Sequence, residues 1–281
     1  MTRPINQPDL FLAPIRDTVD LMDVPFLSLS NRRRVTPIRY RRGDVSVEVS
    51  APAQFGIASV WDWDVALWAV SRIVEAANLG KPLNATVSAP VHDILRSIGR
   101  DVGGRDYHLL KEAADRLVAT TVRTTVRSTT SRGSTFSLLE RVDWQGDDKG
   151  RVIALSITLP SWLLTAIEQR RVLAVDDRYF ALTGGLERWL YRLVRKGAGD
   201  NKTGWRWTMA DLHERSGTTR PLRSFAADVR RLVLADPLPE YRLTRYRTTA
   251  GEGVQAVRRS FLARDDPGYE ARLARSDTAP A

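Results

Sequence analysis

The side chains with the clearest chemical potential are arginines that recur on one face of a predicted helix, residues 220–234. This face carries Arg220, Arg223, Ser224, Arg230 and Arg231, with no acid among them. A guanidinium donates two parallel hydrogen bonds to a phosphate or to a guanine edge. Because an ordinary solvated helix face mixes charges of both signs, this face predicts an anionic partner, and we interpret the partner as nucleic acid.

A second predicted helix, residues 105–118, repeats this arrangement earlier in the chain. Its apolar residues match those of the later helix at one constant offset, so that Leu110 corresponds to Phe225 and Leu117 to Leu232. Its outward face carries Arg105, His108, Lys111 and Arg116 together with Glu112 and Asp115. The basic side chains favour a second nucleic-acid contact. The two acids leave open that this copy depends on Arg105 and its hairpin, or takes part in subunit contact.

Each of these helices follows a shorter helix and a turn, which is the order of a helix-turn-helix. In the first copy a strand ends at Val87, Ser88 caps a helix with Pro90 in its first turn, and the Gly-rich residues 98–104 form the turn. In the second copy Thr208 caps the first helix, with Asp211 three residues on. A hairpin is expected after each pair of helices. The sequence therefore predicts an α+β fold with tandem winged helix-turn-helix domains.

The predicted hairpins, or wings, carry further arginines that could bind phosphates. Residues 121–129 and a turn at 131–134 predict the first wing, and residues 241–248 and 254–261 predict the second, with arginines alternating along one face. The wing arginines are Arg123, Arg127, Arg132, Arg242, Arg245 and Arg247.

An N-terminal segment is also strongly basic. It contains Arg32, Arg33 and Arg34, followed by Arg39, Arg41 and Arg42. We expect it either to lie along a phosphate backbone or in a minor groove, or to be a solvated basic loop.

Three more helices are expected to support these elements. Asp62 or Asp64 begins the first helix, Pro160 precedes a helix that joins the two halves, and residues 183–196 form the counterpart of the first helix. The predicted organisation is a flexible arm over residues 1–22, a first winged-helix domain over 23–159, a second over 160–262 and a flexible tail over 263–281.

The overall composition agrees with a polyanionic partner, because 43 Lys and Arg residues outnumber 33 Asp and Glu residues to give a formal net charge of +10. The chain has no cysteine, which excludes disulfides and thiolate metal sites. No apolar run approaches the roughly 18 residues of a membrane span, and the N-terminus lacks the apolar core of a secretion signal. We expect a soluble, cytoplasmic protein that does not contact membranes.

Several segments recur together in one known family. They are residues 25–29 (PFLSL) with the arginines that follow, 37–40 (PIRY), 57–69 (IASVWDWDVALWA), 103–107 (GGRDY), 117–125 (LVATTVRTT) and 182–196 (LTGGLERWLYRLVRK). In this order, over roughly residues 21–261, the chain resembles plasmid replication initiator proteins of the replication initiator protein A type. The resemblance implies a bacterial protein with winged-helix domains that binds repeated sites, or iterons, in double-stranded DNA at a plasmid origin. It also implies opening of the adjacent duplex and recruitment of the host replication initiator and helicase, and it makes a homodimer possible.

An enzyme is the main alternative class of protein. Rolling-circle initiators cut DNA with a tyrosine beside a metal held by closely spaced histidines, but His92, His108 and His213 form no His-x-His pair. Asp62 and Asp64 are explained by a helix start, and the acids at 147 and 148 by a turn. We therefore expect no catalytic residue, no metal and no cofactor. A nearer alternative is a winged-helix transcriptional regulator without a role in replication, which would use the same helices.

Overall fold

Two stretches of the chain share a long helix, a strand, two helices and a final pair of strands in that order. In the first stretch two further strands, residues 121–124 and 134–137, stand before the final pair. The computed structural model describes residues 14–126, 133–148, 152–249 and 251–269. The first unit consists of α1 (Trp63–Asn78), β4 (Thr86–Pro90), α2 (Val91–Ser97), α3 (Gly104–Ala119), β7 (Arg141–Gly146) and β8 (Val152–Thr158). The second unit consists of α5 (Gly185–Gly197), β10 (Trp205–Thr208), α6 (Met209–Ser216), α7 (Leu222–Ala235), β11 (Tyr241–Thr248) and β12 (Gly251–Arg258).

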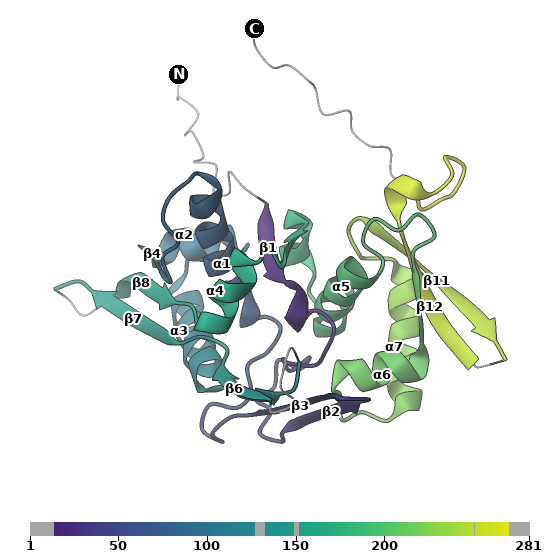
Figure 1. The fold of residues 1–281 in the computed structure, drawn as a ribbon, viewed down its shortest axis with the longest axis horizontal. Helices are drawn as coiled ribbons and strands as arrows, with labels where there is room; N and C mark the ends of the chain where they lie inside the picture. The colour runs from purple at the N-terminus through teal and green to yellow at the C-terminus, as the bar shows by residue number, and fades with distance from the viewer. Residues whose placement is uncertain (1–13, 127–132, 149–151, 250, 270–281) are drawn as a thin grey trace, which may run out of the picture.

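The two units also share their sheet topology. In each unit the first strand pairs with the last and the last pairs with the middle one, which gives antiparallel sheets ordered β4-β8-β7 and β10-β12-β11. Figure 1 shows the hairpins β7–β8 and β11–β12 projecting from opposite ends of the molecule. The two units inferred from the sequence repeat therefore share one strand topology, and the whole fold is mixed α/β.

Local sequence signals explain where the shorter helices begin and end. Thr208 Oγ1 accepts a hydrogen bond from the Asp211 backbone N–H at 3.1 Å, so α6 begins as predicted. Gly217 ends α6 with φ of +59°, and a Cβ there would lie 2.7 Å from Pro25 Cβ. In the first unit the prediction is wrong, because β4 continues through Pro90 and Ser88 lies in the strand. Proline disfavours helical geometry in the residue before it, which moves the helix start to Val91.

A separate four-stranded sheet contains residues that the sequence analysis assigned to the first wing. Its antiparallel strands are β2 (Ile38–Arg42), β3 (Val45–Ser50), β5 (Thr121–Thr124) and β6 (Ser134–Ser137), in the order β2-β3-β5-β6. The prediction that the strand starting at Thr121 forms the wing of the first unit is wrong, because the hairpin that pairs with β4 is β7–β8. Alternation along a strand indicates its two faces but does not specify its partner.

The N-terminal residues belong to the folded protein from Ile15 onward. β1 (Ile15–Thr18) pairs antiparallel with β9 (Val172–Val175), and Leu21 at the end of η1 (Val19–Leu21) is buried. The predicted flexible arm over residues 1–22 is thus corrected for residues 15–22, whereas residues 1–13 lie outside the described part. α4 (Ser161–Glu168) begins after Pro160 as predicted and packs on both β1 and α1.

The remaining short elements are η2 (Asp177–Ala181) before α5 and η3 (Arg259–Phe261) after β12. Arg259 Nη1 donates a hydrogen bond to the Gly268 carbonyl at 3.2 Å, so residues 263–269 of the predicted tail fold back on the second unit. Residues 270–281 lie outside the described part.

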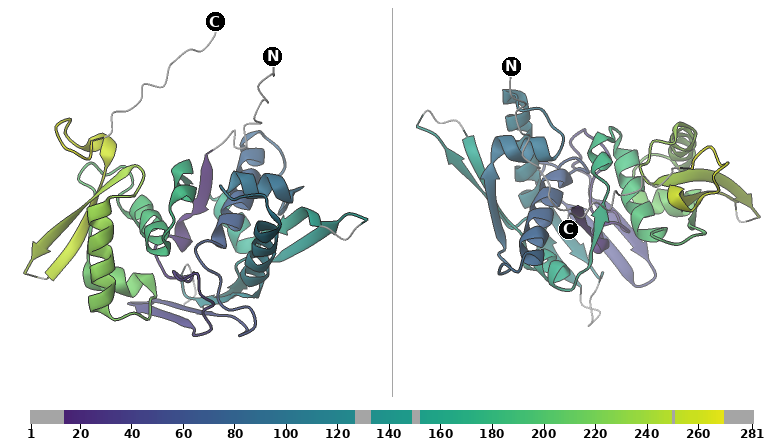
Figure 2. Two further views of the ribbon diagram at one scale, coloured as in Figure 1. Left: turned by 180° about the vertical axis from the view of Figure 1, so that it is seen from behind. Right: turned by 90° about the horizontal axis from the view of Figure 1, so that it is seen from above.

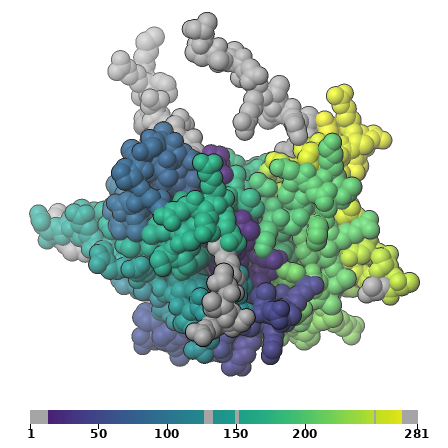
Figure 3. Space-filling model, viewed as in Figure 1, coloured from purple at the N-terminus to yellow at the C-terminus, as the bar shows by residue number. Residues whose placement is uncertain are grey.

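Buried apolar side chains from both units form one continuous core. α1 contributes Trp63 and Leu67, and α5 contributes Leu190 and Leu193. Figure 3 shows the purple N-terminal segment in the seam between the blue and teal first unit and the green second unit. The predicted boundary at residue 160 therefore does not separate two independent cores. Of the helices described, none has the length and apolar character needed to cross a membrane.

Candidate nucleic-acid interface

Helices α3 and α7 face the same side of the molecule, with the basic residues 28–36 between them. Figure 2 (left) shows both helices on the near side when the molecule is seen from behind. A groove of about 480 Å³, lined by Arg32 and Glu112 among others, separates the basic segment from α3. A hollow of about 700 Å³, lined by Arg32, Arg34 and Arg220 among others, separates it from the start of α7. We call this surface the α3–α7 face.

Helix α7 is held by one apolar face and presents the other to solvent. Phe225, Val229 and Leu232 are buried at helical spacing, whereas Arg223 and Ala227 are exposed. Such a helix can lie against a ligand surface without losing its core contacts.

An acid that the sequence analysis left off this face holds two of its arginines. Asp228 forms ion pairs with both Arg220 and Arg231, and its own side chain is only 15% exposed. The predicted acid-free face is therefore corrected. Arg231 remains 77% exposed beyond this contact, and Ser224 is partly buried.

A second acid joins α7 to the hairpin. Glu252 on β12 accepts hydrogen bonds from Arg230 on α7 at 2.7 Å and from Arg245 on β11 at 2.8 Å. Hydrogen bonds from Arg230, and then from Arg245, lower the pKa of the Glu252 carboxyl to about 2. The acid is therefore ionised at neutral pH and fixes the hairpin against the helix.

The three arginines of β11 do not share one face, as the sequence analysis expected. Successive strand residues point to opposite faces, so Arg242 lies opposite to Arg245 and Arg247. Arg242 Nη1 instead binds Asp236 Oδ2 at 2.6 Å. Arg247 is exposed and stands opposite Glu252 in the register of β11 with β12, but among the described residues it forms no ion pair.

Helix α3 presents a more balanced set of charges. Arg105 and His108 are exposed at its start. His108 Nε2 lies 3.2 Å from Glu112 Oε1, and Lys111 Nζ lies 3.0 Å from Asp115 Oδ2, both one helical turn apart. These pairs reduce the net positive charge that α3 offers to an anion.

Arg116 is partly buried and directs its guanidinium toward the start of α1. Its Nε and Nη2 donate to the two oxygens of Asp62 at 2.9 and 2.8 Å, and this hydrogen bonding raises the pKa of Arg116. Arg116 is predicted from sequence to contact DNA, but in the structure its guanidinium is bound to Asp62 and attaches α3 to the start of α1.

Arg123 lies on the outer face of the four-stranded sheet rather than on a wing. It is exposed and stands across from Glu48, which pairs with Arg39 at 3.1 Å. The other two residues predicted for the first wing, Arg127 and Arg132, lie outside the described residues.

The three predicted arginines of the basic segment have different environments. Arg32 is exposed, and Arg33 Nη1 donates to the Gln54 carbonyl at 3.2 Å. Arg34 donates to the Thr36 carbonyl at 3.0 Å and, across the molecule, to the Gly217 carbonyl at 2.7 Å. Burial lowers the pKa of Arg34, whose role is to attach the basic segment to the turn after α6.

Buried ion pairs that the sequence analysis missed connect the two units. Asp64 accepts two hydrogen bonds from Arg188 on α5, at 2.6 and 2.7 Å, and lies 3.4 Å from Arg100. Asp17 on β1 accepts a hydrogen bond from Arg192 at 2.5 Å. The sequence does carry a signal for these pairs, because Arg188 and Arg192 lie one turn apart among the apolar residues of α5. A buried cation requires an anion beside it.

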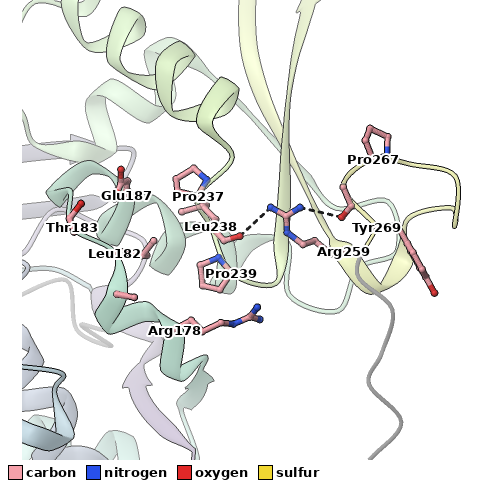
Figure 4. Close-up of a pocket in the computed structure, with 12 residues that line it drawn as sticks. Arg178, Leu182, Thr183, Glu187, Pro237, Leu238, Pro239, Arg259, Pro267 and Tyr269 are labelled. Atoms are coloured by element: carbon pink, nitrogen blue, oxygen red, sulfur yellow. Dashed lines mark hydrogen bonds between the residues drawn. The ribbon is translucent and has the colours of Figure 1, made fainter.

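A further hollow lies at the other end of α7, outside the α3–α7 face. Figure 4 shows this hollow of about 640 Å³, lined by Pro237, Pro239 and Pro267 together with Arg259. Arg259 is already bonded to the Leu238 carbonyl and to Asp236. Among the described residues, no group of three His, Asp or Glu side chains is placed to hold a metal ion.

One family model matches most of the chain. The family described as replication initiator protein A matches residues 16–243. A protein described as a putative replication protein, from Wigglesworthia glossinidia brevipalpis, is 26% identical over 241 residues, which cover 84% of this chain and 86% of that protein.

Two crystal structures of domains 2 and 3 of RctB have a similar fold. Their TM-scores are 0.60 and 0.51, at 13% and 14% sequence identity. Each match covers 85% of this chain, and 97% and 94% of the respective RctB chains. At this level of identity the likeness concerns the fold alone.

Proposed function

Because this chain belongs to the replication initiator protein A family, we propose that it initiates plasmid replication by binding double-stranded DNA in a sequence-specific manner at repeated origin sites. Family membership supports the role of replication initiator. The proposal adds the mode of action, which is recognition of iterons by the α3–α7 face.

We propose that both units are winged-helix domains, with α3 and α7 as recognition helices. In this motif the second helix of the helix-turn-helix enters the major groove, and the hairpin lies beside the backbone. The shared order of elements and the shared strand pairing of the two units support this interpretation.

The placement of α3, the basic segment and α7 on one side of the molecule is the observation that carries the proposal (Figure 2). A single duplex can then contact both helices in successive stretches of groove, while the segment around Arg32 approaches the backbone between them. We expect the second unit to dominate binding, because α3 carries Glu112 and Asp115 and its Arg116 is bound to Asp62.

Later steps of the proposal follow from the family resemblance. We propose that the bound protein promotes opening of the adjacent duplex and recruits the host replication initiator and helicase. A homodimer and a cytoplasmic location associated with the plasmid belong to the same proposal. The chain acts in this scheme by binding and assembly, without catalysing a chemical step and without a metal or cofactor.

An origin-transformation assay tests the proposal. The gene, supplied with the plasmid DNA that flanks it, should sustain replication of a plasmid that carries the neighbouring repeats. Footprinting should protect several direct repeats beside an AT-rich tract. Protection of one promoter palindrome, with no support of replication, would instead favour a transcriptional regulator.

Charge-deletion variants connect this activity to the α3–α7 face. Replacing Arg32 with Ala should weaken binding to all duplexes alike and should reduce the slope of log affinity against log salt concentration by about one. Replacing Arg178 with Ala is the matched control, because Arg178 lines the hollow at the far end of α7. Equal losses for the two variants would show that the face is wrongly assigned.

A further inference from the structure

The outward face of α7 is chemically uneven. Its central residue, Ala227, is exposed, and Leu234, two turns further on along the same stripe, is 78% exposed. Arg223 stands one turn before Ala227 and, among the described residues, has no carboxylate partner. The other arginines around this face are each bound to an acid, Arg220 and Arg231 to Asp228 and Arg230 to Glu252.

We propose that α7 reads a guanine through Arg223 and an adjacent thymine through Ala227, while the acid-bound arginines contact phosphates. This inference rests on the proposed function and deepens it, because it names the base-pair chemistry that the site recognises.

The assignment of Arg223 follows from which guanidinium is free. Guanine presents O6 and N7 in the major groove and requires two parallel donors from one side chain. Arg220 and Arg231 are directed toward Asp228, which lies about 140° around the helix from Arg223 at 100° per residue. Their guanidiniums therefore lie on the flank of the helix, where the sugar-phosphate backbone would pass. Arg223 can place both donors on a base edge without giving up an ion pair.

The assignment of Ala227 follows from its size and polarity. A methyl side chain at the centre of the face lets the helix axis approach the base edges closely, and it leaves no polar group unpaired there. The C5 methyl of thymine is the apolar feature of the major groove that Ala can contact. Leu234 continues the apolar stripe, and its exposed side chain has room for a second methyl contact near the end of the helix.

Selection from a randomised duplex library by the full-length protein tests the guanine contact. We expect the wild type to enrich sites with one fixed guanine next to a thymine. The R223A variant should lose the preference at that guanine and retain it elsewhere, with affinity for the wild-type site reduced roughly 5- to 150-fold. The R247A variant is the matched control, because it removes another exposed arginine that forms no ion pair among the described residues, and it should keep the whole consensus.

Modified bases in the selected duplex test each contact separately by fluorescence anisotropy. Replacing the guanine with 7-deazaguanine removes N7 and should weaken binding of the wild type but not of R223A. Replacing the thymine with deoxyuridine removes one methyl and should weaken binding by about fourfold. An unchanged consensus for R223A would overturn the guanine assignment, and an ineffective deoxyuridine would overturn the thymine assignment. If the wild type enriched no sequence at all, the proposed sequence-specific function would itself fail.

Discussion

Replacing Asp17 with Asn tests how strongly buried charge joins the N-terminal strand to the second unit. Asp17 is fully buried and Arg192 is 2% exposed. Asn keeps the oxygen that accepts hydrogen bonds from Trp63 Nε1 at 3.0 Å and from the Thr18 backbone N–H at 2.8 Å. The substitution therefore removes the negative charge and leaves the neighbouring hydrogen bonds in place. Arg192 is left as a buried cation without its counter-ion.

The expected cost to the free energy of unfolding is about 3 to 5 kcal/mol, as for other buried ion pairs that lose one partner. Urea denaturation followed by tryptophan fluorescence measures this change, since Trp63 contacts the site. Asp143→Asn is the matched control. Asp143 is half-exposed and pairs with Arg141 on the surface at 2.8 Å, so its loss should cost less than about 1 kcal/mol.

A second substitution separates lost charge pairing from general damage. Adding Arg192→Met to Asp17→Asn removes the unpaired cation, so the double variant should be more stable than Asp17→Asn alone. The reasoning is refuted if Asp17→Asn costs no more than Asp143→Asn, or if Arg192→Met adds a further loss.

Three further predictions follow from other charged groups. Burial raises the pKa of Asp64 to about 6, so the contribution of its protonated form to stability is complete below about pH 4 and is lost as pH rises through 6. The wild type should therefore lose stability relative to D64N between pH 4 and 7. Identical pH profiles of the two proteins in calorimetry would contradict this prediction. The lowered pKa of Glu252, about 2, means that the stability contributed by its carboxylate is complete above about pH 4.3 and is lost only as pH falls through 2. E252Q should free Arg230 and Arg245 at pH 7 and steepen the fall of affinity for random duplex with salt concentration. The same salt dependence for E252Q and the wild type would count against this role of Glu252. Arg116→Ala should reduce the free energy of unfolding by about 1 to 3 kcal/mol and leave DNA affinity nearly intact. Arg105→Ala should weaken DNA binding and leave the free energy of unfolding nearly unchanged. Urea denaturation and fluorescence anisotropy on the same proteins measure both quantities, and a larger loss of affinity for Arg116→Ala than for Arg105→Ala would contradict the prediction.

The sequence was sufficient to predict elements whose signals are local. The Thr208 cap, the helix after Pro160 and the order of the three helices in each unit agree with the structure. A cap and an apolar stripe depend on residues a few positions apart, so they can be recognised without knowledge of the tertiary fold.

Strand partners could not be predicted in the same way. The alternating residues from Thr121 suit any half-buried antiparallel sheet, and their pairing with β3 depends on contacts distant in sequence. β1 was missed because four residues give too short a pattern for alternation to be recognised.

The candidate site was predicted in part, because residue type does not reveal what a side chain already binds. Arg34 and Arg116 resemble the other arginines in the sequence, but one donates to the Gly217 carbonyl and the other to Asp62. Arg223 and Arg32 stay exposed as predicted. The difference lies in the positions of acids and carbonyls contributed by remote segments, which composition and spacing do not encode.

The pairing of β1 with β9 has a consequence for how the protein is made. β1 is synthesised before both units, but its partner strand exists only after Val175 has been synthesised. Until then the backbone N–H and C=O groups of β1 that face β9 have no strand partner, so the nascent first unit carries an open strand edge. The sheet of β1 and β9 can therefore close only after the chain has been translated past residue 175, and a chain that stops before β9 leaves β1 as a target for chaperones and proteases.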